Sequence, residues 1–292
     1  MRFIFPDVPD SGVHIRECPP DVLSLVSAAL QPWIVSDSHG STGNAALSAR
    51  CSDGTDATIL DRCALHISRP DNASLFHAVR RAIRQYVAYT AEQQGWVQIH
   101  ASAVLMPDGN VILFAGDKNA GKTSSMLGLC SSVRGTKFVS NDRVLVHPSS
   151  PTALGWPTAV GIGEKALEIL GLHHMKRYET AGKYWLWPED IRRECGITFA
   201  AAGSISLVVC PQFTCRPTPI RIQDVTCADV LRRNIRRDAL EDTNWWNIAR
   251  PNANTYGSWL TGVPWLTRIR AITVQTEGLG PDYLDTLAQL IS

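Results

Sequence analysis

Short apolar stretches separated by turn-forming residues make up most of the first 70 positions of the chain. This pattern is typical of short strands in a small sheet. A helix is expected near Pro20–Gln31, and the polar residues at 36–43 predict a loop. The expected strands are Phe3–Phe5, Val13–Ile15, Trp33–Val35, Ala57–Leu60 and Ala64–Ile67.

The pattern changes to a helical period over Ala73–Gln94, which Gly95 is placed to end. Arg80, Arg81 and Arg84 fall opposite the apolar face, where a solvated position is the simplest expectation. The apolar positions of the helix are Leu75, Val79, Ile83, Val87 and Tyr89. We therefore expect residues 1–94 to form a small α+β region and residues 95–292 to form a second domain.

The second region contains further expected strands and helices. A strand over Val97–Leu105 turns at Asp108–Asn110 and leads into a second strand at Val111. A third strand, Lys137–Val139, is broken by Ser140-Asn141-Asp142. Arg143–Val146 either pairs with that third strand or continues it.

The last part of the chain predicts further elements of both kinds. Helices are expected at Glu164–Leu170, Cys227–Asp242 and Asp282–Ile291. Extended segments are expected at Ser204–Val209, Ile220–Ile222 and Val263–Val274.

Composition excludes several classes of function. The 292 residues are 45% hydrophobic, which supports a sizeable core, and the net charge of +1 argues against nucleic acid as a main partner. No apolar run is long enough to span a membrane, and no secretory signal precedes the first strand, so we expect a cytoplasmic protein without a membrane partner. The eight cysteines include no CxxC pair, which argues against a zinc knuckle.

A glycine-rich motif with the spacing GxxxxGKT follows the apolar strand that begins at Val111. Its glycines let successive backbone N–H groups point at phosphate oxygens, and the helix that follows turns its positive end toward the anion. Lys122 can reach the β- and γ-phosphates of a nucleotide, and the Thr123 hydroxyl is placed for Mg²⁺. The expected phosphate-binding residues are Gly116, Asp117, Lys118, Asn119, Ala120, Gly121, Lys122, Thr123 and Ser124.

A nucleotide site of this kind needs a carboxylate near the end of an adjacent strand. Asp142 is the well-placed candidate, although an aspartate at a strand end is also a common turn former. His100 lies on the strand before the hairpin that carries the glycine-rich motif, where it is either a partner of Asp142 or a structural strand histidine.

Three ordered pieces of the chain together resemble the HPr kinase/phosphorylase family, which shares its nucleotide-binding core with the ATP-dependent phosphoenolpyruvate carboxykinases. They are His100–Val104, Gly116–Thr123 and Phe138–Val146, the last similar to the family's hydrophobic–Asp-Asp–Arg-Val segment. The resemblance covers about residues 95–150 and is absent from the first ninety. It implies an α/β P-loop kinase core of this type, preceded here by the small N-terminal α+β region.

The resemblance implies an ATP- and Mg²⁺-dependent serine kinase that acts on a peptide or protein. Lys122 would clamp the phosphates, while Thr123, Asn141 and Asp142 would hold the metal. Asn141 departs from the family's first acid and cannot accept a proton, which puts reverse phosphorolysis in doubt. Asp142 is favoured as the base with His100 as its partner; the alternatives are His100 as the base, or a transfer in which proton removal is not critical.

Relatives of this family include kinases that act on the C-terminal serine of lasso-peptide precursors, and the chain looks more like those tailoring enzymes. Two other functions stay open. One is a kinase for a small-molecule hydroxyl. The other is a non-catalytic nucleotide-binding regulatory protein, which is compatible with the asparagine at position 141. The family often assembles into rings, so a homo-oligomer is also compatible with the resemblance.

Basic residues beyond the core motif have two interpretations each. Lys183 either contacts phosphate from a loop or is solvated. The same choice, between an anion-binding set and a solvated helix face, applies to Arg232, Arg233, Arg236 and Arg237.

Overall fold

A computed structural model describes residues 1–5, 8, 10–31, 34–35, 45–53, 57–61, 63–156, 158–175, 178–180, 182–214, 216, 218–235, 246 and 260–291. The chain divides into two compact units, residues 1–96 with 237–253 and residues 97–236 with 254–292. The first unit therefore takes in Trp246, which the sequence-based division places in the second domain. The expected loop at 36–43 lies outside the described residues.

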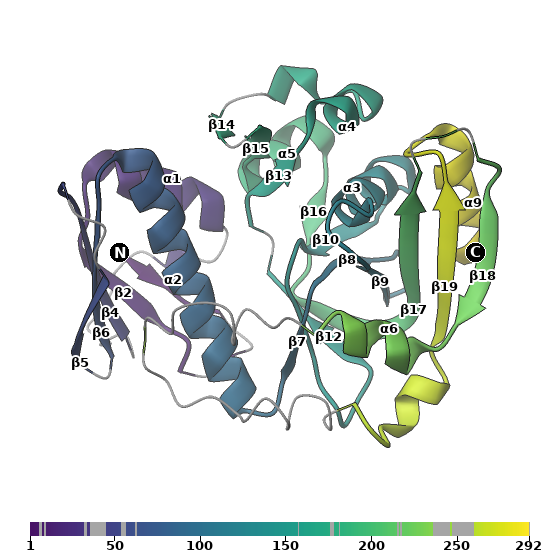
Figure 1. Ribbon diagram of the computed structural model, residues 1–292, viewed down its shortest axis with the longest axis horizontal. Coiled ribbons are helices and arrows are strands. Elements are labelled where there is room, and N and C mark those ends of the chain that lie inside the picture. The colour runs from purple at the N-terminus through teal and green to yellow at the C-terminus, as the bar shows by residue number, and fades with distance from the viewer. Residues whose placement is uncertain are drawn as a thin grey trace. The chain divides into compact units, whose positions relative to one another are not determined.

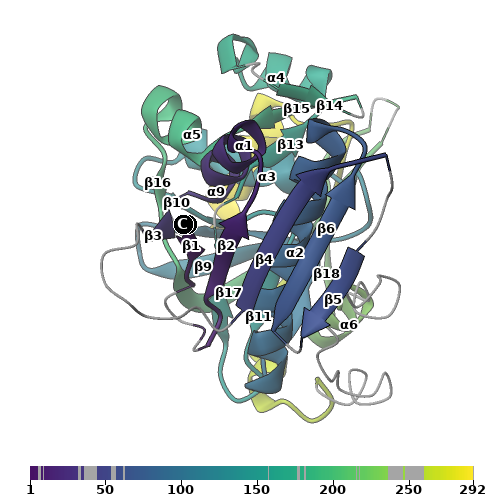
Figure 2. The same ribbon diagram turned by 90° about the vertical axis from the view of Figure 1, so that its left-hand side faces the viewer.

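The first unit contains a six-stranded sheet with the order β3-β1-β2-β4-β6-β5, seen face-on in Figure 2. Its strands are β1 (Arg2–Phe3), β2 (Val13–Glu17), β3 (Ile34–Val35), β4 (Ala45–Cys51), β5 (Ala57–Asp61) and β6 (Ala64–Arg69). Strand β4 is not among the strands expected from the sequence, because its small and polar residues give little strand signal. This strand is central nonetheless, because it pairs in parallel with both β2 and β6.

Two helices, α1 (Pro20–Leu30) and α2 (Asn72–Gln93), cover one face of this sheet (Figure 1). The Asp71 carboxylate caps α2 by accepting a hydrogen bond from the Ser74 N–H at 2.8 Å. Arg84 does not lie on a solvated face as expected: it is buried, since α2 packs on more than its apolar stripe. The indole of Trp246 is also buried, and its N–H donates to the Ala82 carbonyl at 2.8 Å.

The second unit is a mixed α/β structure around a ten-stranded sheet in which β9 lies between antiparallel β8 and parallel β17. Its strands are β7 (Val97–Ile99), β8 (Ala101–Leu105), β9 (Asn110–Ala115), β10 (Lys137–Ser140), β11 (Val144–Val146), β12 (Thr152–Leu154), β16 (Thr198–Phe199), β17 (Ala202–Phe213), β18 (Arg221–Val225) and β19 (Arg270–Thr276). Figure 1 shows β17, β19 and β18 side by side at one end of this sheet.

One antiparallel ladder of this sheet is interrupted in the middle. Ala103 pairs with Ser140, and four residues along each strand Ile99 pairs with Val144. His100 and Asp142 lie in the gap between these pairs. The expected strand 97–105 is therefore two strands, because β8 also pairs with β9 while β11 turns to pair with β12. Residues 144–146 continue the strand 137–140 and do not pair with it.

Helices α3 (Lys122–Ser132) and α9 (Pro281–Ile291) pack together and contribute to the apolar core of the second unit. A smaller sheet has the order β13-β15-β14. Its strands, with the remaining helices of this part, are β13 (Val160–Ile162), α4 (Glu164–Ile169), η1 (His173–Met175), β14 (Tyr178–Thr180), β15 (Lys183–Leu186) and α5 (Pro188–Cys195). No helix among the described residues is long and apolar enough to cross a lipid bilayer.

Two expected elements differ in the structure. Helix α6 (Cys227–Arg233) ends at Arg233 with Asn234 as its C-cap, short of the expected end at Asp242, and residues 236–242 lie outside the described part of the chain. The expected extended segment from Val263 begins with a 3₁₀ turn, η2 (Pro264–Thr267). Proline is favoured at the first position of such a turn, and the buried Trp265 and Leu266 hold it.

Candidate active site

The glycine-rich motif forms a loop between β9 and the N-terminus of α3. Gly116, Asn119 and Gly121 have positive φ angles of 150°, 66° and 102°, so the backbone turns through conformations that side chains disfavour. A Cβ atom at Gly121 would lie 2.6 Å from Cζ of Phe213, which packs directly over the loop. The loop ends at the N-terminus of an eleven-residue helix, whose positive partial charge stabilises an anion.

Lys122 folds its side chain back over this loop. Its ammonium donates hydrogen bonds to the carbonyl oxygens of Gly116, at 2.8 Å, and Asp117, at 2.7 Å. The residue is only 7% exposed, so these carbonyls compensate the burial of its charge. The positive charge thus lies within the curl of the loop, where phosphate groups would bind.

Asn234 joins the loop to His100, which lies at the break between β7 and β8. Its side-chain oxygen accepts the Gly116 N–H at 3.0 Å, and its backbone carbonyl accepts the His100 N–H at 2.7 Å. Its amide nitrogen donates to the Val230 carbonyl at 2.9 Å, which fixes the orientation of the side chain. Asn234 was not expected in the site, because the predicted helix over Cys227–Asp242 places it in a helix interior, whereas α6 ends at Arg233 and Asn234 is its C-cap.

His100 and Asp142 face each other across the gap in the ladder. The Nε2 atom of His100 lies 3.2 Å from Oδ1 of Asp142, and both side chains are about one-third exposed, at 33% and 37%. Asp142 has a φ of 74°, a left-handed conformation that aspartate tolerates better than most residues. The Ser140 hydroxyl donates to the Arg143 carbonyl and closes the turn that presents the Asp142 carboxylate.

The second half of the loop, the start of α3 and the His–Asp pair line one cavity of about 580 Å³, which we call the His–Asp cavity. The predicted phosphate-binding residues Gly116, Asp117 and Ala120 do not line it but line a separate cavity of about 840 Å³. The structure thus brings together His100, Lys122, Thr123, Ser124 and Asp142, although they come from three separate stretches of the chain. The remaining lining residues are Ser102, Lys118, Asn119, Gly121, Gly161, Ile162, Gly163, Gly182, Lys183 and Phe213.

Ser102 was not expected in the site. Its side chain is fully buried, and among the described residues its hydroxyl oxygen has no hydrogen-bond partner. A buried hydroxyl without a partner is uncommon, and this one belongs to a residue that lines the His–Asp cavity. The sequence signal was its position two residues after His100.

Asn141 is not brought to this cavity. Its side chain donates to the Ala159 carbonyl and accepts from the Thr158 hydroxyl, both at 3.2 Å, and it is buried. Among the described residues no group of three or more His, Cys, Asp or Glu side chains is placed to hold a metal ion. Mg²⁺ bound with a nucleotide needs only one or two protein ligands, and Thr123 and Asp142 fit that requirement.

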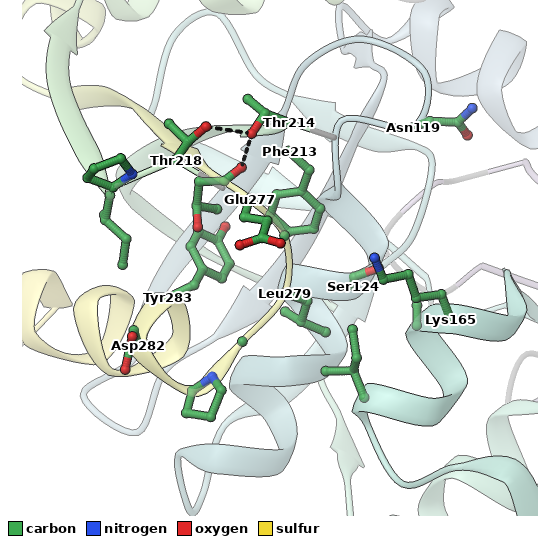
Figure 3. Close-up of a pocket in the computed structure, with 18 residues that line it drawn as sticks. Asn119, Ser124, Lys165, Phe213, Thr214, Thr218, Glu277, Leu279, Asp282 and Tyr283 are labelled. Atoms are coloured by element: carbon green, nitrogen blue, oxygen red, sulfur yellow. Dashed lines mark hydrogen bonds between the residues drawn. The ribbon is translucent and has the colours of Figure 1, made fainter. Parts of the chain in front are cut away.

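A second cavity, of about 600 Å³, adjoins the first and is shown in Figure 3. We call it the Tyr283 cavity. Asn119, Ser124 and Phe213 line both cavities, so the two communicate along the end of the loop. Its wall combines apolar side chains, among them Leu279, with the charged groups of Lys165 and Glu277.

Tyr283 links this second cavity to the helix that follows the loop. Its hydroxyl lies 2.7 Å from the Ser125 hydroxyl, which in turn donates to the Gly121 carbonyl at 2.9 Å. Burial raises the pKa of Tyr283, so the phenol stays protonated at neutral pH and can serve as the donor. Gly121 therefore has its carbonyl held on one side and Phe213 packed over it on the other.

The basic residues beyond the loop are separated from one another. Arg232 forms an exposed ion pair with Asp229 at 3.2 Å. Arg233 lines a third cavity, of about 840 Å³, on the side of the loop that includes Asn234. Arg236 and Arg237 lie outside the described residues. Lys183 lines the His–Asp cavity.

No protein-family model matches the chain, and no curated protein matches it. Among solved structures the chain is similar to the HPr(Ser) kinase/phosphatase from Coxiella burnetii. The match has a TM-score of 0.32 and 12% sequence identity, and it covers 66% of this chain and 93% of the other. At this level of similarity neither a family nor an activity follows from the neighbour.

Proposed function

We propose that the chain is an ATP- and Mg²⁺-dependent kinase that transfers the γ-phosphate to a serine hydroxyl of a peptide or protein. One observation carries the proposal: the Lys122–Thr123 end of the glycine-rich loop and the His100–Asp142 pair line the same cavity. An anion-binding loop alone supports nucleotide binding. A carboxylate that faces the same space adds the group that transfer requires.

In this proposal the triphosphate lies along the loop and the start of α3. The helix N-terminus and the ammonium of Lys122 neutralise its charge. A bound phosphate would exchange for one or both of the carbonyl contacts that Lys122 now makes. Mg²⁺, held by Thr123 and Asp142 when bound, supplies further charge neutralisation.

The base of the nucleotide is assigned to the Tyr283 cavity. Ser124 and Asn119 line both cavities, so a nucleotide can place its phosphates in one and its base in the other. The Phe213 ring and Leu279 offer apolar surface to a flat base, and Glu277 and Lys165 offer polar partners at its edge (Figure 3).

Transfer needs a hydroxyl in line with the bond that breaks. The serine Oγ forms a bond to the γ-phosphorus while the bond from this phosphorus to the bridging oxygen breaks, and ADP leaves with the electron pair. The proton of the hydroxyl passes to the Asp142 carboxylate, which His100 holds through the 3.2 Å contact. In this role His100 is a positioning residue, donating its Nε2–H to the carboxylate.

The wall of the cavity at β13 and β15 favours an extended peptide as the acceptor. Gly161, Gly163 and Gly182 lie in this wall, so backbone groups face the space in place of side chains. Backbone groups recognise extended peptides through main-chain hydrogen bonds. Peptides that end in serine are the first acceptors to test, because the sequence resembles kinases of that kind.

The test is incubation with γ-labelled ATP, Mg²⁺ and serine-containing peptides, followed by measurement of label in the peptide. We expect transfer by the wild type and by Lys137→Ala, a matched change of an exposed lysine on β10, and none by Lys122→Ala. Transfer to small alcohols alone would make the chain a small-molecule kinase. ATP binding without transfer to any acceptor would make it a nucleotide-binding protein, and the proposal would be wrong.

A further inference from the structure

Lys183 is the first residue of β15 and lies next to the turn that joins β14 to β15. It is exposed, and among the described residues it forms no ion pair. It nevertheless lines the His–Asp cavity, on the wall formed by the small β13-β15-β14 sheet. A positive charge without a carboxylate partner therefore borders the space where the γ-phosphate would be transferred.

The path of the Lys183 side chain depends on Gly161. In the pairing of β13 with β15, Gly161 is opposite Trp185, two residues beyond Lys183. A Cβ atom at Gly161 would lie 3.5 Å from Cδ of Lys183 and 3.5 Å from Cη2 of Trp185. The stem of Lys183 thus passes over the glycine, in contact range of where a side chain would begin. A branched side chain at position 161 would occupy the space that the lysine stem uses.

The cavity holds few other charges. The titratable groups that line it, besides Lys183, are His100, Lys118, Lys122 and Asp142. The ammonium of Lys122 is held at the loop by its two hydrogen bonds to carbonyl oxygens, so it would contact the phosphates from the loop side. Lys183 comes from a different sheet on another wall. A γ-phosphate in this space would have the ammonium groups of Lys118 and Lys122 on the loop side and that of Lys183 on the β15 side.

We propose that Lys183 is a catalytic residue that contacts the γ-phosphate, and that Gly161, which has no side chain, leaves room for the side chain of Lys183. This inference rests on the proposed kinase function. Charge on the transferred phosphoryl group is spread over its three equatorial oxygens during transfer, and a cation placed beside them lowers the barrier. Because the ammonium is on a wall separate from the loop, it acts on the terminal phosphate and not on the α- and β-phosphates.

The experiment compares the wild type with single variants at the two positions: Lys183→Met, Lys183→Arg, Gly161→Ala and Gly161→Val. The measurements are kcat, the KM for the peptide, and the Kd values for ATP and ADP. For Lys183→Met we expect kcat to fall about 100-fold, as for the loss of one transition-state donor. Its Kd for ATP is expected to rise about fivefold, because one charged contact that is screened by solvent is lost. Its Kd for ADP is expected to stay unchanged. Lys183→Arg keeps the charge and retains most activity.

The glycine variants separate the effect of the charge from that of the fold. Gly161→Ala adds only one atom, in ordinary contact with the Lys183 stem, and is expected to lower kcat much less than Gly161→Val does. Gly161→Val displaces the lysine stem and reproduces the kcat loss of Lys183→Met without removing the charge. Adding Lys183→Met to Gly161→Val then costs little more, because the two changes act on one interaction.

Failure of the Lys183 assignment and failure of the proposed kinase function give different results. If the wild type transfers phosphate and Lys183→Met matches it in kcat and in the ratio of Kd for ATP to Kd for ADP, the assignment of Lys183 is overturned. The same holds if Lys137→Met, a control on β10, loses as much activity as Lys183→Met. If the wild type itself neither transfers phosphate nor distinguishes ATP from ADP, the proposed function fails and this inference fails with it.

Discussion

The side-chain oxygen of Asn234 accepts a hydrogen bond from the backbone N–H of Gly116 at 3.0 Å, across a separation of 118 residues. Gly116 is the first residue of the glycine-rich loop, where its φ is 150°. Because it has no Cβ atom, it can also adopt other conformations in which the loop would open. The bond from Asn234 therefore helps to fix the entry of the loop. The same residue bonds His100 through its backbone, so both parts of the candidate site share one support.

We predict that Asn234→Ala weakens ATP binding about tenfold, equal to roughly 1.4 kcal/mol, because the Gly116 N–H loses its acceptor and the loop becomes less ordered. Titration calorimetry of ATP binding checks this. Asn110→Ala is the matched control, since its side chain bonds only Asp108 in an exposed turn, at 2.7 Å. Equal affinities for ATP in Asn234→Ala and the control would show that Asn234 does not support the loop.

We predict that Asp142→Asn lowers kcat by at least about 100-fold, because the amide cannot accept the serine proton. Binding of ATP is expected to change little, since the loop and Lys122 are untouched. His100→Gln should cost less, about tenfold, because it orients the carboxylate without taking part in the transfer. Single-turnover kinetics with labelled ATP measures both variants.

Asp285→Asn on α9 removes an exposed carboxylate outside the cavity and is the control for the change at Asp142. Retained turnover in Asp142→Asn would assign the base to another residue. A larger loss in His100→Gln than in Asp142→Asn would exchange the roles of the two residues.

We predict that Gly121→Ala lowers the free energy of unfolding by about 2 kcal/mol or more, from the positive φ and the overlap with Phe213 together. Thermal and denaturant unfolding of the whole chain measure the effect. Gly163→Ala is the matched control, because its φ is −83° and no atom lies within 4 Å of an added Cβ. Similar stabilities for the two variants would mean that Phe213 and the loop adapt at no cost.

We predict an acid-dependent contribution of Asp71 to the stability of the first unit. Hydrogen bonds from the backbone and hydroxyl of Ser74 lower the pKa of this carboxyl from its usual 3.8. A lowered pKa in the folded state means that the stabilisation is complete above about pH 3.8 and is lost as the pH falls through the folded-state value.

The measurement for Asp71 is the Tm of the wild type and of Asp71→Asn from pH 7 down to pH 3. Asparagine still caps the helix but does not titrate, so the advantage of the wild type should shrink as the pH falls. A difference in Tm that stays constant over this range would contradict the prediction.

Local signals explain what the sequence could predict. The strand, glycines and lysine of the loop are contiguous, so Gly116–Thr123 could be recognised without knowledge of the fold. Asp142 and His100 were expected near the loop because each lies at a strand position beside it. Their facing arrangement depends on the gap in the ladder, which no pattern in Val97–Leu105 indicates.

Other features depend on contacts between distant segments and left no signal in the sequence. The strand β4 is rich in alanine and is fixed by its two parallel neighbours, not by its own propensity. Asn234 and Ser102 acquire their importance only when the strands that they serve have been assembled. The Tyr283 cavity is likewise formed by segments far apart in the chain, including Asn119, Phe213 and Tyr283.

The position of β9 in its sheet has a consequence for synthesis of the chain. The strand that leads into the loop needs β17 as its parallel neighbour, and Ser204–Val209 are made well after Asn110–Phe114. On the ribosome, the loop would emerge with one edge of its strand unpaired and with its Asn234 contact still to come. A nascent chain halted before residue 202 is therefore expected to remain sensitive to protease around the loop, and protection should appear only after residue 234 has left the exit tunnel.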